Sequence, residues 1–278
     1  MWNKILFFNS LSDYQFIKYA DHVLHILCLK GSMSFTIQNV RYNVVPKDYV
    51  ILPSPSLALD FSESNDFEAI IMCPSNLFIT SMSIRSNYGI IGHMSLLSNP
   101  IIKLSPHDYR ICTEDLLRIK ERLAEDGHLF REEMIGYLLL THILDLYDIH
   151  AKSQSEHNIN ISERNGDLFK RFIELLYNKE YIKKRNLSYY ASKLYITPHY
   201  LTEVCKKVSG QPATYWIDHF ITHEIVCLLR QKEIPLKDLA DKMNFSSLSH
   251  LSRYVQKQTG MSPSEYRNRI AEKTHIVK

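Results

Sequence analysis

The C-terminal part of the sequence contains two stretches whose polar side chains could bond base edges and phosphates. In each stretch, polar and basic residues recur on one side of an expected helix, and apolar residues occupy the other side. Such polar side chains form hydrogen bonds with base edges and phosphate oxygens. The residues expected to contact a nucleic acid are His199, Tyr200, Thr202, Glu203, Lys206, Lys207, Leu248, Ser249, His250, Ser252, Arg253, Gln256, Lys257 and Arg267.

Arg253 is the strongest single candidate for a contact with DNA, because a guanidinium can bond guanine through two parallel hydrogen bonds. The alternative is a surface ion pair with Asp241 or Glu265, an interaction that contributes little to stability. We favour the contact with a base or a phosphate.

Glu203 is the one acidic residue in this set. Its carboxylate could accept a hydrogen bond from a cytosine amino group, or it could form an ion pair within the protein. We favour the ion pair, because phosphates repel a carboxylate. The cations expected to touch phosphates, or otherwise to be solvated charges, are Lys206, Lys207, Lys257 and Arg267.

The two stretches, residues 187–210 and 236–260, are copies of one pattern. The offset between equivalent residues rises from 49 to 50, so the second copy has one extra residue just before its second helix. The equivalent pairs are Ala191 and Ala240, Leu194 and Met243, Ile196 and Phe245, Leu201 and Leu251, Cys205 and Val255, and Gly210 and Gly260.

Each copy is typical of a helix-turn-helix unit. A small alanine lets the two helices cross closely, and an apolar residue in the turn fills the angle between them. Thr197-Pro198 in the first copy, and Ser246 or Ser247 in the second, are expected to begin the second helix. A helix over about 213–231 should join the copies, and such a spacer could set the recognition helices about 34 Å apart, one turn of DNA. A plain helical bundle is the alternative.

The charge of the chain is unevenly distributed. Residues 166–278 contain 19 basic and 11 acidic residues, a net charge of +8, whereas residues 1–165 contain 14 basic and 19 acidic residues, a net charge of −5. A basic half next to an acidic half is expected when a phosphate-binding module is joined to a different kind of domain.

The first 98 residues or so contain short runs rich in Ile, Val, Phe and Tyr, separated by turn signals. Short strands at regular spacing predict an antiparallel sandwich or a small barrel. The expected strands are residues 22–29, 33–38, 42–45, 49–52, 57–61 and 69–73.

Helical spacing of apolar residues begins after Ser105. It predicts a hairpin of two helices, about 105–127 and 130–149, whose broad apolar stripe is typical of packing on a barrel and on a partner subunit. The polar stretch 151–165 is expected to be the inter-domain linker.

Four histidine and aromatic residues of the strand region could line an effector cavity or could form an ordinary aromatic core: His25, Phe35, Tyr42 and Tyr49. His22 and His25, together with His93, also suggest a metal site. However, a spacing of three places two strand side chains on opposite faces, and no nearby carboxylate completes a ligand set. We therefore expect neither a metal nor a cofactor.

Over about residues 168–270, the chain resembles the AraC/XylS family of bacterial transcription regulators. The motifs that carry this resemblance are Leu236-x-x-x-Ala240-x-x-x-x-Phe245-Ser246, Leu251-Ser252-Arg253-x-Val255 and Thr259-Gly260-Met261-Ser262-Pro263-Ser264-Glu265-Tyr266-Arg267. Four positions depart from the family pattern. Asn244 stands where the family usually has glycine, and it tolerates a left-handed backbone. Ile221 and Ile225 stand where the family often has arginine and alanine, so one expected phosphate contact is lost, and Glu203 stands where arginine is frequent.

The resemblance implies an α+β fold with two domains. The first, residues 1–150, would be a cupin-like effector-binding and dimerisation domain, with a β-barrel over about 1–98 and a helical hairpin over about 105–150. The second, residues 166–278, would be an all-α DNA-binding domain with two helix-turn-helix units joined by a long helix. The resemblance also implies a sequence-specific transcription regulator, most often an activator. It would respond to a small-molecule effector, dimerise through residues 105–150, work with RNA polymerase and insert both recognition helices into successive major-groove segments of double-stranded DNA.

Other features of the sequence exclude several classes of protein. The apolar run near residue 5 is too short for a signal peptide, and no stretch approaches the roughly 18 apolar residues of a membrane helix. The five scattered cysteines are expected to be reduced thiols of a cytoplasmic protein. We expect no enzymatic activity. The alternatives are a metal-dependent cupin enzyme with an appended helical domain and an adaptor that binds protein.

Overall fold

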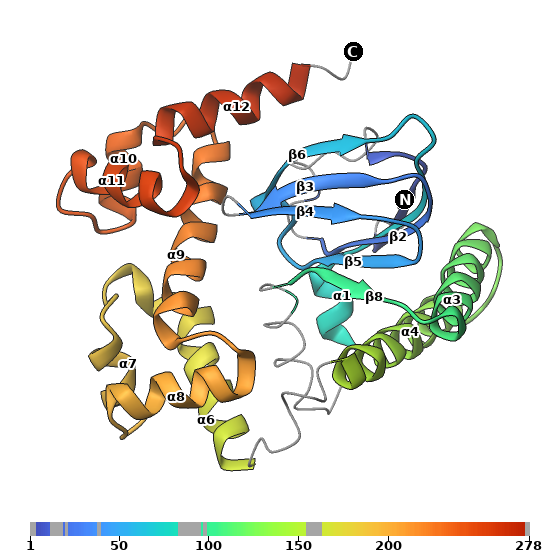
Figure 1. The fold of residues 1–278 in the computed structure, drawn as a ribbon, viewed down its shortest axis with the longest axis horizontal. Helices are drawn as coiled ribbons and strands as arrows, with labels where there is room; N and C mark the ends of the chain where they lie inside the picture. The colour runs from blue at the N-terminus through green and yellow to red at the C-terminus, as the bar shows by residue number, and fades with distance from the viewer. Residues whose placement is uncertain are drawn as a thin grey trace. The chain divides into compact units, whose positions relative to one another are not determined.

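The computed structural model describes residues 4–11, 19, 22–37, 40–82, 96, 99–153 and 163–275. They divide into two compact units (Figure 1). The first comprises Met1–Thr36 and Arg41–Ile159, and the second comprises Asn160–Lys278 with the short segment Ile37–Val40. None of the helices in the described ranges is long and apolar enough to cross a membrane.

The strands of the first unit form two sheets. The five-stranded sheet has the order β1 (Ile5–Phe8), β7 (Glu68–Pro74), β2 (Leu24–Lys30), β5 (Asp48–Leu52) and β8 (Ile101–Lys103), and its neighbouring strands are antiparallel. The three-stranded sheet has the order β4 (Val40–Val44), β3 (Met33–Ile37) and β6 (Ala58–Glu63). The α+β class is confirmed, although the described strands form two separate sheets instead of one closed barrel. The short strands β1 and β8 were not among the predicted runs.

The alternation of side chains along β2 decides which residues face the helices. Leu27 belongs to the buried cluster that packs the sheet against the helices, and His25 lies two residues away on the same face. Leu24 and Ile26 therefore point to the opposite face, where their partners on β5 are Leu52 and Val50. Each face of this sheet thus has a buried layer of its own.

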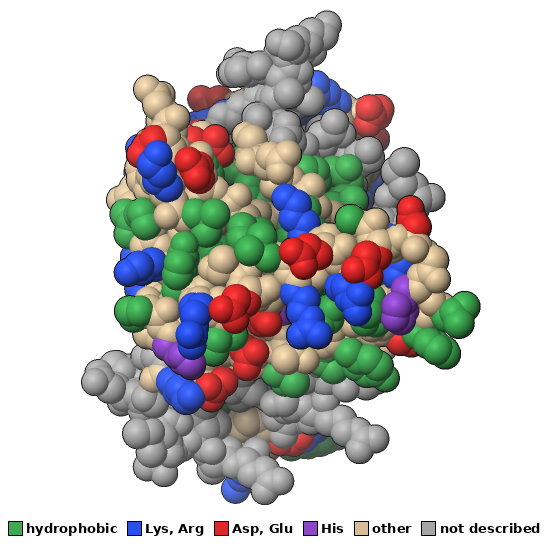
Figure 2. All heavy atoms as spheres, turned by 90° about the vertical axis from the view of Figure 1, so that its right-hand side faces the viewer, with side chains coloured by type: hydrophobic (Ala, Val, Ile, Leu, Met, Phe, Trp, Pro, Cys, Tyr) green, Lys and Arg blue, Asp and Glu red, His purple; other side chains and the backbone are tan. Residues whose placement is uncertain are grey.

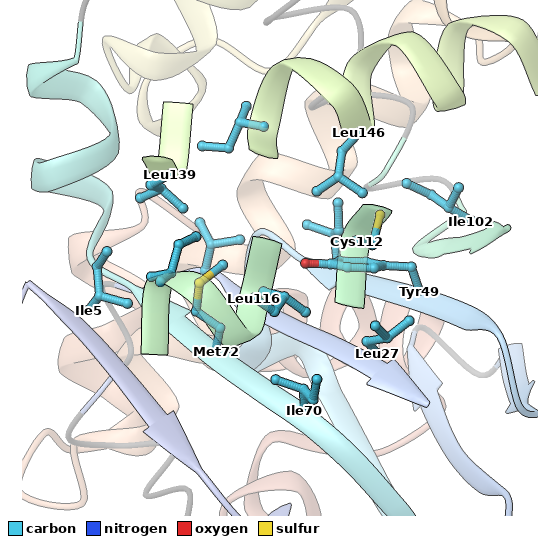
Figure 3. Packing of buried hydrophobic residues seen from close by; sticks show 14 of the residues in the cluster. Ile5, Leu27, Tyr49, Ile70, Met72, Ile102, Cys112, Leu116, Leu139 and Leu146 are labelled. Carbon is cyan, nitrogen blue, oxygen red and sulfur yellow. The ribbon is translucent and has the colours of Figure 1, made fainter. Parts of the chain in front are cut away.

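The described part of the first unit also contains α1 (Asn76–Ser81), which lies between β7 and β8 in the chain, and α3 (Pro106–Ala124) and α4 (Arg131–Ser153), which follow β8. The hydroxyl of Ser105 accepts a hydrogen bond from the backbone N–H of Asp108 and caps α3, as the Ser105-Pro106 pair predicts. Helices α3 and α4 pack against each other as the expected hairpin. Figure 3 shows Tyr49 and Leu27 of the sheet packed with Cys112 and Leu116 of α3.

Of the expected linker 151–165, residues 151–153 lie in α4 and residues 163–165 lie in α6, while 154–162 lie outside the described residues. His93, one of the residues weighed for a metal site, also lies outside them.

Between residues 163 and 275, the second unit consists of helices joined by turns and short links. Its elements are α6 (Glu163–Tyr177), η3 (Glu180–Ile182), α7 (Leu187–Lys193), α8 (Pro198–Ser209), α9 (Ala213–Arg230), α10 (Leu236–Lys242), α11 (Leu248–Thr259) and α12 (Pro263–His275). Helix α9 contacts α8 and also α10, α11 and α12, so the expected long helix joins the two halves (Figure 1). Trp216 on α9 is fully buried and packs edge-on against Phe169 of α6.

Candidate nucleic-acid interface

The two copies of the sequence pattern fold into equivalent helix-turn-helix units, α7–α8 and α10–α11. In both, a hydroxyl caps the second helix: Thr197 Oγ1 accepts from the backbone N–H of Tyr200 (3.2 Å), and Ser247 Oγ accepts from that of His250 (3.1 Å). Both second helices end at a left-handed glycine, at Gly210 and at Gly260. Since Ser247 is the cap, Ser246 is the extra residue of the second copy.

The two turns have the same backbone conformation. Tyr195 (φ +57°) and Asn244 (φ +52°) occupy the same left-handed position, which confirms the role expected of Asn244. The next residue in each turn donates its backbone N–H back to the alanine of the first helix: Ile196 to the carbonyl of Ala191 (3.0 Å), and Phe245 to that of Ala240 (2.8 Å).

The two recognition helices, α8 and α11, bury their apolar faces and expose most of the predicted contact residues. Leu201, Val204 and Cys205 are buried on α8, and Leu251 and Val255 are buried on α11. Among the predicted contact residues of these helices, Tyr200, Thr202, Glu203 and Ser252 are half-buried. The exposed ones are His199, Lys206, Lys207, Leu248, Ser249, His250, Arg253, Gln256 and Lys257.

Arg253 is exposed, and within the part of the chain that the structure describes no hydrogen bond or ion pair engages its guanidinium. The alternative pairing with Asp241 or Glu265 does not form there. Glu203 Oε1 and Lys206 Nζ are 3.2 Å apart, so the favoured ion pair of Glu203 is present within α8. Arg253 thus keeps all its donors for a ligand, whereas Glu203 neutralises part of the charge of the first recognition helix.

Several other predicted contacts already have partners within the protein. Thr202 Oγ1 donates to the carbonyl of Pro198 (3.1 Å), and the hydroxyl of Tyr200 donates to Asn165 Oδ1 (3.2 Å). Gln256 Nε2 donates to the carbonyl of Gly260 (2.7 Å), and His250 Nδ1 lies 3.1 Å from Ser246 Oγ. Each of these groups would have to give up its hydrogen bond within the protein in order to form one with DNA.

Comparison with known proteins identifies this part of the chain. A family described as "Helix-turn-helix domain" matches residues 190–269, which include both recognition helices. Residues 190–269 are therefore similar to helix-turn-helix domains of the AraC type. The matched segment covers both copies of the repeat and the run that ends at Arg267, and these carried the resemblance in the sequence.

Two curated relatives match this AraC-type region. The "Uncharacterized HTH-type transcriptional regulator YtdP" of Bacillus subtilis (strain 168) is 23% identical over 119 residues, which are 43% of this chain and 14% of that protein. The "Uncharacterized HTH-type transcriptional regulator YijO" of Escherichia coli (strain K12) is 23% identical over 137 residues, which are 49% of this chain and 47% of that protein. The match thus spans less than half the length of either relative.

Among solved structures, ToxT from Vibrio cholerae aligns with 95% of this chain and 94% of its own, at 15% identity and a TM-score of 0.47.

Arg267 has a different role from the predicted phosphate contact. Its Nε donates to the carbonyl of Leu229 (3.2 Å), and its Nη2 donates to the carbonyl of Ile234 (2.8 Å). The last carbonyls of a helix lack partners within the helix, and this guanidinium supplies donors to one such carbonyl of α9 and to the link before α10. Arg267 therefore holds the AraC-type domain together, and we withdraw it from the predicted interface.

Sequence reasoning missed Arg185, which lies between η3 and α7. Its Nη2 donates to the carbonyl of Met243, and its guanidinium lies 3.8 Å from the ring centroid of Phe245. It thereby fastens the turn of the second helix-turn-helix unit to the first half of the AraC-type domain. No periodic pattern in the sequence predicts such a contact, because Arg185 and Met243 are 58 residues apart.

In the first unit, the four residues proposed to line an effector cavity form two separate groups. Phe35 and Tyr42 belong to the three-stranded sheet and stack with ring centroids 5.3 Å apart. His25 and Tyr49 lie on the helix-facing side of the five-stranded sheet, where His25 Nδ1 is 3.1 Å from the Tyr49 hydroxyl. The structure therefore does not bring the four together around one cavity.

The pair His25 and Tyr49 extends into a buried chain of hydrogen bonds. The Tyr49 hydroxyl lies 2.8 Å from His142 Nε2 on α4, and His142 Nδ1 lies 3.1 Å from Asp115 Oδ2 on α3. Burial, followed by the neighbouring His142, lowers the pKa of His25 to about 3, and burial raises the pKa of Tyr49. The chain thus joins the sheet to both helices of the hairpin.

Within the described ranges, no group of three His, Cys, Asp or Glu residues is placed to bind a metal ion, so nothing there supports the metal site that His22, His25 and His93 suggested. His22 pairs with Ser75 in an isolated bridge, and His25 belongs to the buried chain with Tyr49, so the two histidines do not share a site.

Proposed function

We propose that this chain is a sequence-specific, DNA-binding transcription regulator that inserts α8 and α11 into successive major-groove segments of a duplex. The observation that carries the proposal is the pair of equivalent helix-turn-helix units, one of which presents Arg253 with all its donors available. An exposed arginine on a recognition helix is suited to reading guanine. Lys207 on α8 and Lys257 on α11 are both exposed and suit phosphate contacts.

The first unit is suited to a different role. On the face shown in Figure 2, Lys, Arg, Asp and Glu side chains are interspersed and neither sign dominates. We therefore assign DNA binding to residues 166–278 and, as part of the same proposal, binding of a small-molecule effector to residues 1–150. In this proposal residues 151–165 act as the linker. The regulator is an activator that works with RNA polymerase. It has no catalytic role.

The proposal includes a homodimer formed through α4. Tyr137 and Leu144 lie seven residues apart on one face of α4, and Phe130 directly precedes the helix. The exposed fractions of Phe130, Tyr137 and Leu144 are 65%, 69% and 45%. A hollow of about 490 Å³ lies along this face between residues 130 and 141. Apolar side chains at heptad spacing are suited to pairing with the same face of a second copy.

The test of this function is selection of DNA by the full chain from a library of random duplexes, followed by titration over a range of salt. We expect one sequence class to be enriched. We also expect the affinity to fall steeply with salt, because each phosphate contact releases counterions. Failure to enrich any duplex, or an affinity that is independent of salt, would contradict the proposal and favour an adaptor that binds protein.

A further inference from the structure

Tyr195 combines a left-handed backbone with an exposed side chain. Its φ is +57°, and the residue is 90% exposed. Bulky residues rarely adopt this conformation, because Cβ crowds the following carbonyl oxygen. At the equivalent position of the second unit, φ is +52° and the residue is Asn244, which tolerates the conformation better. Tyrosine at position 195 is therefore an unfavourable choice for the stability of the turn.

The packing of the protein does not explain this choice. The backbone N–H of Tyr195 donates to the carbonyl of Ser192 (3.1 Å), and any residue other than proline could make that bond. Among residues 4–153 and 163–275, apart from those that the structure leaves undescribed, the phenol ring has no ring contact and no side-chain hydrogen bond. Strained residues that the fold itself does not require tend to occur at functional sites.

The position of Tyr195 in the fold indicates a function in DNA binding. It precedes the cap residue Thr197 by two positions, so it lies where the chain enters the first recognition helix. Lys193, two residues before Tyr195, is exposed, and Lys207 is exposed further along α8. Tyrosine hydroxyls are among the groups that bond phosphate and sugar in protein–DNA complexes.

We propose that Tyr195 is an additional DNA-contacting residue: its hydroxyl donates to a phosphate beside the groove that α8 enters, and its ring covers the adjoining deoxyribose. This inference rests on the proposed function. The contact would not depend on base sequence, and it would strengthen binding by the unit in which Glu203 reduces the positive charge of the recognition helix.

The test compares Tyr195→Phe and Tyr195→Asn with the wild-type full chain. The probes are a duplex that the wild-type chain selects from a random library and an unrelated duplex of equal length. We expect Tyr195→Phe to lower the affinity for both duplexes about fivefold, and Tyr195→Asn about tenfold. The slope of log affinity against log salt should not change, because a neutral hydroxyl releases no counterion.

Thermal unfolding separates a contact with DNA from a role in folding. Tyr195→Asn should unfold at the same temperature as the wild type or about 2 °C higher, because the strain is relieved. The control Tyr177→Phe removes a hydroxyl from another exposed tyrosine of the same unit and should leave the affinity unchanged.

The possible outcomes distinguish the two proposals. If the wild type enriches a duplex and both Tyr195 variants bind it as tightly as the wild type, the assignment of Tyr195 is wrong and the proposed function stands. A loss of affinity that accompanies a lower unfolding temperature would also overturn the assignment. If the wild type enriches no duplex, both proposals fail.

Discussion

The guanidinium of Arg185 lies over the ring of Phe245, 3.8 Å from its centroid, and this contact joins the two halves of the AraC-type domain. Phe245 is the buried apolar residue of the second turn, and Arg185 also donates to the carbonyl of Met243 in the same turn. One side chain of the first half thus holds the segment from which the second recognition helix begins.

Replacing Arg185 with alanine should therefore destabilise the second helix-turn-helix unit. The variant loses a cation–π contact and a hydrogen bond to a buried carbonyl, so we expect the free energy of unfolding to fall by about 2 kcal/mol. Urea unfolding of the full chain, followed by tryptophan fluorescence, measures the change; Trp216 is the tryptophan of this domain, and Trp2 is the other tryptophan of the chain. Lys193→Ala, which removes an exposed cation in the first half, is the control and should change stability by less than about 0.5 kcal/mol. Equal stability of the two variants would contradict this role of Arg185.

Arg253→Ala should leave stability unchanged and weaken binding to the selected duplex by about 1–3 kcal/mol. The loss should be much smaller on an unrelated duplex, because a contact with a base edge counts only where that base is present. Lys257→Ala is the matched comparison on the same helix. It should weaken binding to both duplexes similarly and reduce the salt slope by about 1. A uniform loss for Arg253→Ala would show that its partner is a phosphate.

Arg267→Ala tests the correction to the predicted interface. Because Arg267 donates to the carbonyls of Leu229 and Ile234, we expect its removal to lower the free energy of unfolding by about 1–2 kcal/mol. Arg267→Lys should not restore it fully, since one ammonium cannot reproduce two donors in a fixed plane. DNA affinity corrected for the unfolded fraction should equal that of the wild type. A change in the salt slope would instead support the original prediction of a phosphate contact.

The buried His25 predicts how stability depends on pH. Its pKa is lowered to about 3 in the folded protein by burial, so below its ordinary value of about 6.5 the unfolded chain binds a proton that the folded chain does not. Stability should therefore fall as pH decreases from about 6.5 towards 3, by at most about 1.4 kcal/mol per pH unit from this group. His25→Asn, whose amide can still donate to Tyr49, should make this decline shallower.

The measurement is urea unfolding at pH 7 and at pH 5 for both proteins. His107→Asn, which replaces an exposed histidine of the same unit, should follow the wild type. If His25→Asn shows the same difference between the two pH values as the wild type, His25 does not control the decline.

Tyr137→Glu tests the proposed dimer. Tyr137 is in the middle of the exposed stripe on α4, so a carboxylate there would have to be buried without a partner in the dimer. We expect sedimentation to show mostly dimer for the wild type and mostly monomer for the variant, with little change in unfolding temperature. Glu121→Gln on α3 changes a charge outside this stripe and serves as the control. Equal self-association of Tyr137→Glu and the wild type would contradict this interface.

Much of the C-terminal unit could be predicted because its signals are local. Caps, left-handed glycines and the spacing of apolar residues act within about one helical turn, so the bounds of α8, α9 and α11 follow from the printed residues. The ion pair of Glu203 and Lys206 is of the same kind, since the two residues are three positions apart on one helix.

The strand region was harder to predict. Its strands are only three to seven residues long, and the runs that predict them do not specify which strands pair. The proposed effector residues show the consequence. His25 and Phe35 are both buried aromatic side chains, but the pleat of β2 turns His25 towards the helices and Phe35 belongs to the other sheet.

The sequence by itself determined the two helix-turn-helix units, their unequal recognition helices and the two-part organisation of the chain, because these depend on contacts between neighbours in the sequence. Only the tertiary structure decided what the long polar side chains do. Arg267 and Arg185 reach carbonyls 33 to 58 residues away, and Tyr49 meets His142 across 93 residues. Such partners are chosen when helices pack and bury polar groups that must then be satisfied, so no pattern of spacing along the chain can specify them.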